Sequence, residues 1–341
     1  MIRRTLFAGL ASLLTIASPL AAQNTPNERD TSPHSIRFVT VQDNVKLEVL
    51  DWGGSGRPII LLHGGNSTAH EFDTFAPKLT GSYHVYGITR RGCGASSSPD
   101  ATDANYTADR LGDDVLAVIS ELGIDPPVLV GHSLGGQELS SIGSRHPQRI
   151  AGLIYLDAAY QYAYYDRSKG FLDIDVNEVR RKLEQLEPGK RPQDPTSLID
   201  ELLQTDLPNL EKTLRQIDER FKNAPPQPPA STQHARPPMP PILAAMMRGS
   251  ERYTDIRAPA LAVYALEAVG GSEGSAREAV EARNQMKRDQ ATAFRAGVPS
   301  AHVVLLENAS HDVFQSNESD ILREMNEFIK SLPKPGDHPK T

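Results

Sequence analysis

The sequence predicts an α/β protein with a mostly parallel central sheet, helices on both faces of that sheet, and a helical cap insertion. Short apolar runs with almost no polar interruption alternate with stretches of helical periodicity. Parallel strands have this composition because crossover helices bury both of their faces. Residues 160–250 break the alternation: a tyrosine cluster is followed by charged helix-like stretches and a Pro-rich stretch at 224–241. We expect this segment to be an insertion above the sheet.

The apolar runs predict eight strands. The first two runs are expected to pair with each other, and the run at 58–63 (PIILLH) is typical of a buried strand. The expected strands are 36–41, 46–52, 58–63, 84–89, 128–131, 152–157, 260–266 and 303–306. Apolar residues at helical spacing predict core helices at 108–122, 134–145 and 320–332, and cap helices around 177–186 and 197–221.

The first residues resemble an export signal. Arg3 and Arg4 precede an apolar run at 6–16, and Ala21 and Ala22 offer a cleavage site. The apolar run is shorter than the roughly 20 residues of a membrane span, so we expect no stable membrane anchor after cleavage, with an uncleaved anchor as the alternative. We therefore predict a periplasmic or secreted protein. Its expected parts are a signal peptide (1–22), a flexible leader (23–35), the core (36–159 and 251–333), the cap (160–250) and a tail (334–341).

Composition narrows the function classes. The chain of 341 residues is long enough for one large core with an insertion, and 23% of its residues are charged. Its formal net charge is −7 and it has no basic stripe, so we expect no nucleic-acid partner. Cys93 is the only cysteine, which excludes an intramolecular disulfide. Without a zinc-binding H-E-x-x-H, a cysteine pair or a P-loop, we expect no metal and no cofactor. The sequence does not indicate an oligomeric state.

One motif carries nucleophile chemistry. Residues 131–135 read Gly-His-Ser-Leu-Gly, which matches G-x-S-x-G, and a strand runs directly into the motif and a helix directly out of it. On such a strand-to-helix turn, Gly131 and Gly135 avoid collisions, and Ser133 stands above the carboxyl edge of the sheet. The adjoining helix N-terminus favours developing negative charge. We therefore predict that Ser133 is a nucleophile.

With this motif in its context, the chain resembles the α/β-hydrolase family. Three further segments support the resemblance, which covers nearly all of the chain outside the leader and insertion. They are His63-Gly64-Gly65, similar to the family's oxyanion loop; residues 91–96 (RGCGAS), similar to its R-G-x-G-x-S segment; and residues 308–311 (NASH), similar to its catalytic-histidine loop. The resemblance implies an α/β-hydrolase fold. It also implies that the backbone N–H groups of Leu134 and Gly65 form the oxyanion hole.

The general base and its acid follow from position. His311 comes after the last strand and before the final helix, so it reaches the same sheet edge as Ser133, and we predict that it is the base. Two candidates remain for the acid. Asp157 ends a continuous apolar strand, as the acid does in some relatives, and we favour it. Glu267 follows the next strand, where the family more often has its acid, but it comes early for that role.

A serine nucleophile favours hydrolysis through an acyl-enzyme. In the resembling haloalkane dehalogenases and epoxide hydrolases the nucleophile is an aspartate, so those activities are disfavoured. We predict a carboxylic-ester hydrolase with a small-molecule acyl substrate, whose preference the cap would set. The alternatives are a prolyl-aminopeptidase-like peptidase, a hydrolase of lactones or C–C bonds, and a non-catalytic binding protein that retains the pocket.

Overall fold

The computed structural model describes residues 33–124, 126–223, 238–270 and 274–333. The predicted signal peptide, most of the predicted leader, the tail and most of the Pro-rich stretch lie outside the described residues. Within the described residues, no helix combines the length and the apolar character needed to cross a membrane.

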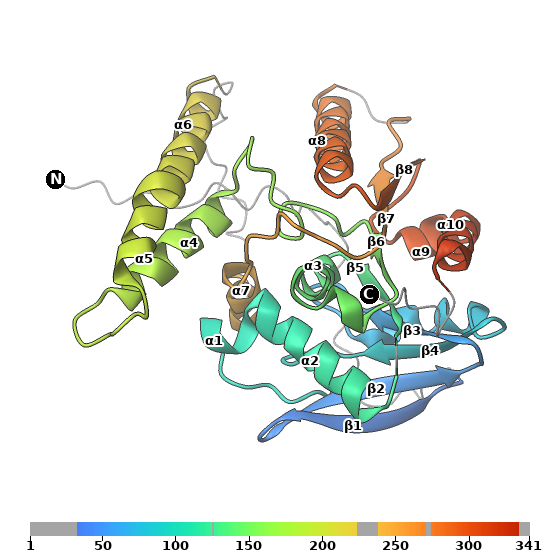
Figure 1. Ribbon diagram of the computed structural model, residues 1–341. Helices are drawn as coiled ribbons and strands as arrows, with labels where there is room; N and C mark the ends of the chain where they lie inside the picture. Colours follow the sequence, from blue (N-terminus) through green and yellow to red (C-terminus); the bar gives the residue numbers. More distant parts are fainter. Residues whose placement is uncertain (1–32, 125, 224–237, 271–273, 334–341) are drawn as a thin grey trace. The chain divides into compact units, whose positions relative to one another are not determined.

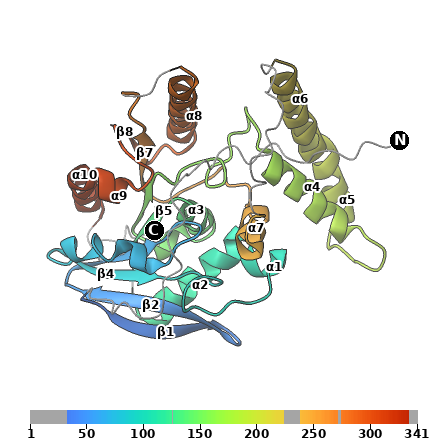
Figure 2. The same cartoon turned by 180° about the vertical axis from the view of Figure 1, so that it is seen from behind.

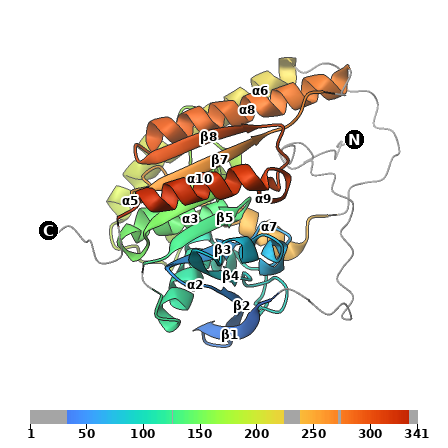
Figure 3. The same ribbon diagram turned by 90° about the vertical axis from the view of Figure 1, so that its right-hand side faces the viewer.

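The strands of the described residues form one sheet of eight, in the order β1-β2-β4-β3-β5-β6-β7-β8. β2 pairs antiparallel with both β1 and β4, and all other neighbours are parallel, which confirms the predicted mostly parallel sheet. Figure 3 shows β1 at one edge and β8 at the other. Every predicted strand is present within two residues at either end. The bounds are β1 Ser35–Gln42, β2 Val45–Gly53, β3 Arg57–Leu62, β4 Tyr83–Ile88, β5 Val128–His132, β6 Gly152–Leu156, β7 Ala260–Leu266 and β8 Ala301–Glu307.

Helices cover the two faces of this sheet (Figure 1). The core helices are α1 Asp103–Tyr106, α2 Ala108–Glu121, α3 Gly135–Arg145, α8 Ser275–Gly297, α9 Val313–Ser316 and α10 Glu318–Ser331, with short turns η1 Ala69–Phe72, η2 Ala76–Lys78 and η3 Pro147–Arg149. Helix α8 was not among the predicted helices. Most of its residues are charged, polar or alanine and are not buried, and only a narrow stripe that includes Ala291 and Phe294 is buried, so its sequence carries little apolar periodicity.

Side-chain alternation along the strands divides the core into two layers. In β3, Ile60 and Leu62 pack on one face with residues of α2, α3 and α8. Their neighbours Ile59 and Leu61 pack on the other face with residues of η1, η2, α9 and α10. Because both faces are covered, the central strands are almost wholly apolar, as the sequence pattern indicated.

The cap elements lie between β6 and β7 in the chain. They are α4 Leu172–Gln185, α5 Pro195–Glu201, the π-helical turn η4 Leu202–Asp206, α6 Leu207–Asn223 and α7 Pro241–Arg248. Helix α7 contacts both α4 and α1 and so connects cap and core, as Figure 2 shows from behind. It begins at Pro241, the last residue of the Pro-rich stretch, because proline is tolerated in the first turn of a helix.

Candidate active site

Ser133 lies in a tight turn between β5 and α3. Its φ of 49° is in the left-handed region, which is uncommon for a residue with a side chain. A Cβ on Gly131 would lie 2.9 Å from the carbonyl carbon of Gly135, and a Cβ on Gly136 only 2.1 Å from the carbonyl oxygen of Ala158. A Cβ on Gly135 would lie 2.8 Å from the carbonyl oxygen of Leu62. The turn therefore requires glycine at 131 and 135, as predicted, and also at 136, which the prediction did not name.

Asp157 follows the last residue of β6 and has a second left-handed backbone, with φ 45°. Its side chain is fully buried. Oδ1 accepts a hydrogen bond from the backbone N–H of Ala265 in β7 at 2.8 Å, and Oδ2 lies 2.7 Å from Nδ1 of His311. The carboxylate is thus fixed by the neighbouring strand while its second oxygen faces the histidine.

The surroundings of Asp157 keep it ionised. Burial opposes the charge, but the hydrogen bond with His311 and the positive charge of Lys287 outweigh burial and lower the pKa of Asp157. Lys287, from α8, places Nζ 3.4 Å from Oδ2 and donates to the carbonyl of Ala265 at 2.8 Å. The hydroxyl of Tyr160 donates to Oδ1.

His311 lies in the loop between β8 and α9. Because Nδ1 faces a carboxylate, it carries the proton, and the lone pair is left on Nε2. Nε2 is buried and has no hydrogen-bond partner among the described residues. His311 therefore has the tautomer that a general base needs, with its accepting nitrogen unengaged by described groups.

Glu267, the other candidate acid, has a different partner. Its carboxylate forms two hydrogen bonds with the guanidinium of Arg283 in α8, at 2.9 and 2.7 Å. The hydrogen bond from Arg283 is the main cause of the lowered pKa of Glu267. The structure thus brings Asp157, and not Glu267, to His311.

The predicted oxyanion loop lies against the serine turn. A Cβ on Gly64 would lie 3.4 Å from Cβ of Ser133, and a Cβ on Gly65 would lie 3.6 Å from Cδ2 of Leu134. Arg90 donates to the carbonyls of His63 at 2.7 Å and of Gly64 at 3.2 Å. With these carbonyls bound to Arg90, the loop packs beside the turn that carries Ser133 and Leu134.

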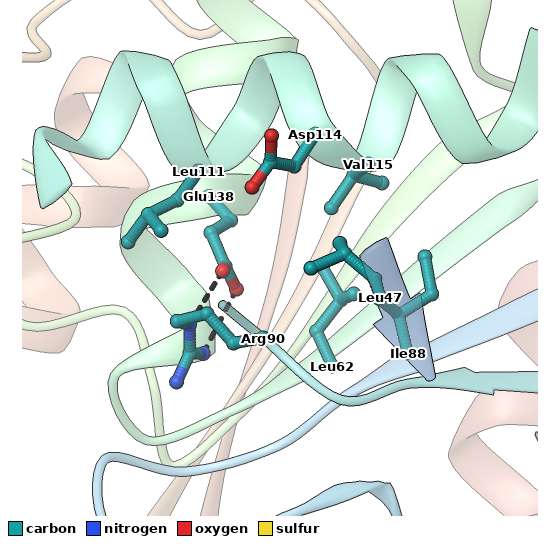
Figure 4. A pocket seen from close by; sticks show the side chains of 8 residues that line it. All are labelled: Leu47, Leu62, Ile88, Arg90, Leu111, Asp114, Val115 and Glu138. Atoms are coloured by element: carbon teal, nitrogen blue, oxygen red, sulfur yellow. Dashed lines mark hydrogen bonds and ion pairs between the residues drawn. The ribbon is translucent and has the colours of Figure 1, made fainter. Parts of the chain in front are cut away.

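Arg90, which binds this loop, and its neighbour Arg91 both form buried ion pairs with core helices. Arg90 pairs with Glu138 of α3 through two hydrogen bonds, at 2.6 and 3.0 Å, and Arg91 pairs with Asp114 of α2 at 2.6 Å. Figure 4 shows a small cavity between Arg90, Glu138 and Asp114. Its volume of about 10 Å³ is close to that of one water molecule, so it is too small for a substrate.

A family model described as the alpha/beta hydrolase family matches residues 59–324. The chain belongs to this family. The fluoroacetate dehalogenase of a Burkholderia species is 34% identical over 122 residues, which cover 35% of this chain and 40% of that protein. The bifunctional esterase/perhydrolase of Acinetobacter calcoaceticus is 34% identical over 113 residues, covering 32% of this chain and 40% of that protein.

The solved structure of an esterase from Exiguobacterium antarcticum is similar to this α/β-hydrolase chain in fold. Its TM-score is 0.55 at 18% sequence identity, and the match covers 86% of this chain and 99% of that one. By contrast, this α/β-hydrolase chain spans about two fifths of the length of the two curated relatives named above.

Sequence reasoning missed several contacts of the site. The tyrosine cluster was expected to wall a pocket or to fill the core, and its members divide. Tyr164 and Tyr165 are buried, whereas Tyr160 donates a hydrogen bond to Asp157 and Tyr162 packs against Tyr160. Closeness in sequence to Asp157 was the one available signal for that pair. Lys287 gave no signal, because it lies on the helix that the sequence did not predict.

One group of potential metal ligands occurs within the described part of the chain. His34, His70 and Asp73 place donor atoms within 4.8 Å of one another. Hydrogen bonds with Asp73 and Glu48 raise the pKa of His70 to about 10. Nδ1 of His70 lies 2.9 Å from Asp73 and Nε2 lies 3.8 Å from Glu48, so these contacts fit an ion pair between η1 and β2.

Proposed function

We propose that this α/β-hydrolase chain is an exported serine hydrolase that cleaves carboxylic esters through an acyl-enzyme on Ser133. One observation carries the proposal: Asp157 Oδ2 lies 2.7 Å from His311 Nδ1, beside a serine held in a strained turn. A buried carboxylate, a histidine oriented by it and a serine on a strand-to-helix turn are the groups that serine acylation requires.

The proposed reaction proceeds in two halves. Ser133 Oγ attacks the ester carbonyl carbon while His311 Nε2 takes the hydroxyl proton, and the tetrahedral oxyanion accepts hydrogen bonds from the backbone N–H groups of Gly65 and Leu134. The intermediate collapses, and the departing alcohol takes the proton from His311. Water then attacks the acyl-enzyme with His311 as base, which releases the acid and restores the hydroxyl. Asp157 stays ionised and stabilises the imidazolium.

The residue at position 133 separates ester cleavage from the chemistry of some relatives. The resemblance implies an aspartate nucleophile in dehalogenases and epoxide hydrolases, and this chain has serine. A serine ester is an acyl-enzyme that water can cleave. The similarity to a protein named esterase/perhydrolase supports the same reading. We therefore propose a small-molecule ester as the substrate.

The start of the cap lies beside the proposed site. The hydroxyl of Tyr160 donates to Asp157, and the ring of Tyr162 packs against that of Tyr160 with centroids 6.1 Å apart. We propose that this cap segment influences which acyl groups fit.

The proposed export rests on the N-terminal sequence alone. Expression of the full chain in a bacterium followed by fractionation tests it. Mature protein in the periplasm or medium, with its N-terminus near residue 23, supports export, whereas an intact N-terminus in the cytoplasm contradicts it.

Labelling with a fluorophosphonate probe, read by intact mass and peptide mapping, tests the proposed chemistry. We expect a single adduct on Ser133 and turnover of p-nitrophenyl acetate and butyrate. Ser133→Ala should lose both while its circular dichroism spectrum stays unchanged. Undiminished ester turnover in that variant would contradict the assignment of the nucleophile.

A further inference from the structure

A second histidine–carboxylate pair lies beside the proposed catalytic pair. Nδ1 of His132, the residue before Ser133, is 2.9 Å from Oε1 of Glu71 in η1. The two side chains are buried, with 5% and 12% of their surface exposed. The ring centroid of His132 lies 4.7 Å from that of His311. This pair adjoins the site, and the reaction proposed above does not use it.

The pair contacts three separate segments of the site. Oε1 of Glu71 also accepts a hydrogen bond from the backbone N–H of Gly64, in the oxyanion loop after β3, at 3.1 Å. Nε2 of His132 lies 3.2 Å from the backbone carbonyl oxygen of His311, in the loop after β8. His132 itself belongs to the serine turn after β5. One continuous set of hydrogen bonds therefore joins the segments that carry the oxyanion donors, the nucleophile and the base.

The contacts of His132 define its protonation state. Both ring nitrogens face oxygen atoms that can only accept, one in a carboxylate and one in a carbonyl. A neutral imidazole has one N–H and one lone pair, so one of the two contacts would be repulsive. Only the imidazolium donates from both nitrogens.

His63 provides a contrast within the same site. Its Nε2 accepts from the backbone N–H of Arg90 at 2.9 Å, and its Nδ1 lies 2.7 Å from the carbonyl of Gly64. One nitrogen accepts and the other donates, which matches a neutral ring. Burial lowers the pKa of His63 to about 3, in agreement with these contacts. Of the two buried histidines, the contacts of His63 thus fit a neutral ring and those of His132 an imidazolium.

We propose that Glu71 and His132, as carboxylate and imidazolium, are positioning residues that hold the oxyanion loop, the serine turn and the His311 loop at a fixed spacing. This inference rests on the proposed function at Ser133. Neither side chain is assigned a bond to the substrate. Their effect is on the alignment of Gly65, Ser133 and His311, on which the rate of acylation depends.

The charged groups around His132 explain why the ring stays protonated. The charged groups are Glu71 from η1, Asp157 after β6 and Asp312 after β8, and the neighbouring titratable rings are His63 after β3 and His311 after β8. Burial opposes the charge, but the hydrogen bond and negative charge of Glu71 outweigh it and raise the pKa of His132. Asp312 is half exposed and lies 3.5 Å from Nε2, so its effect is smaller. Loss of the Glu71 charge should therefore let His132 deprotonate at a lower pH.

Nuclear magnetic resonance tests the charge state without any assay of activity. Long-range ¹H–¹⁵N spectra of the full chain, with the His132 signals assigned from His132→Gln, report whether each ring nitrogen carries a proton. At about pH 7, above the ordinary histidine pKa of about 6.5, we expect both nitrogens of His132 to be protonated in the wild type and one to be unprotonated in Glu71→Gln. A neutral His132 ring in the wild type at that pH would overturn the proposal.

Kinetics test the positioning role. In Glu71→Gln the amide oxygen can replace Oε1 as acceptor, but the negative charge that favours the imidazolium is lost. A neutral His132 ring has one repulsive contact, so we expect kcat to fall about 10- to 100-fold with KM within about threefold. In this variant kcat should also acquire a decline on the alkaline side as His132 loses its proton. His132→Gln should have a similarly low kcat without that decline, because the titrating ring is gone. A merely structural role would lower the unfolding free energy and leave the pH profile unchanged.

Another histidine–carboxylate pair, at the amino end of β4 and away from the proposed site, offers a control. Nε2 of His84, near the start of β4, lies 2.8 Å from Oδ1 of Asp51, and His84→Gln should change neither kcat nor the pH profile. Fluorophosphonate labelling separates the two proposals. Failure of the wild type to label contradicts the serine-hydrolase function itself. A labelled wild type with equal labelling rates and pH profiles in Glu71→Gln and His132→Gln contradicts the positioning role.

Discussion

Replacing Asp157 by asparagine tests the proposed site with the smallest change in shape. The Oδ1 position can still accept from the backbone N–H of Ala265, which lies 2.8 Å away. The new amide N–H₂ then faces Nδ1 of His311, where Oδ2 had accepted at 2.7 Å. Two donors cannot share that contact, so Nδ1 must become the acceptor and the proton moves to Nε2. His311 can then no longer take the proton of Ser133.

The size of the effect follows from this change of tautomer. Loss of the acid in a comparable triad lowers kcat by roughly 10⁴-fold. At 1.36 kcal/mol for each factor of ten, this raises the barrier by about 5.4 kcal/mol. The buried carboxylate also faces Lys287, whose side chain is 15% exposed and can turn toward water. We therefore expect the free energy of unfolding to fall by only about 1–3 kcal/mol.

The assay compares Asp157→Asn with Glu267→Gln, the same carboxylate-to-amide change one strand away. Glu267 pairs with Arg283, and both side chains are one-third exposed, so losing this pair should cost about 0–1 kcal/mol of stability and change kcat by less than about twofold. Turnover of p-nitrophenyl butyrate gives kcat, and urea unfolding gives stability.

The two variants separate the candidate acids. A loss of several orders of magnitude in Asp157→Asn with a nearly unchanged Glu267→Gln supports Asp157. The reverse result would refute the reasoning from the His311 hydrogen bond. Small losses in both variants would show that neither carboxylate orients the base.

Three further changes probe the backbone and the pH response. Ser133→Gly should remove activity yet be about 1 kcal/mol more stable than Ser133→Ala, because glycine relieves the left-handed backbone strain at this position. Thermal unfolding of the two variants measures this difference, and a less stable glycine variant would contradict the strain argument. Gly136→Ala should destabilise by more than about 2 kcal/mol, because its Cβ would lie 2.1 Å from the carbonyl oxygen of Ala158; Gly81→Ala, whose Cβ meets nothing within 4 Å, is the control, and equal urea midpoints would refute the clash. The pKa of His63 is about 3 in the folded chain and 6.5 in the unfolded chain, so between these pH values only the unfolded chain binds a proton at His63. The stability that neutral His63 contributes is therefore lost as pH falls through this window. His63→Gln should lose less stability than the wild type between about pH 7 and pH 4.5 in urea titrations, and an equal loss would contradict this explanation.

The sequence determined the sheet and the places where chemistry could occur. Strand positions could be predicted because a strand covered on both faces must be apolar along its whole length, as residues 58–63 and 260–266 are. The turn at Ser133 could be predicted because its glycines are required by local sterics. His311 could be placed because strands that run parallel end at one edge. Each of these inferences depends on a periodicity or on neighbours along the chain.

The tertiary structure decided which groups meet. Asp157 and Glu267 both follow central strands, and only the packing of α8, which brings Arg283 to Glu267 and Lys287 to Asp157, distinguishes them. The positive φ of Asp157 is equally invisible in the sequence. The contact between Glu71 and His132 joins residues 61 positions apart. Hydrogen bonds and charges act over a few ångströms in space, so the protonation states of the site depend on packing that no local pattern records.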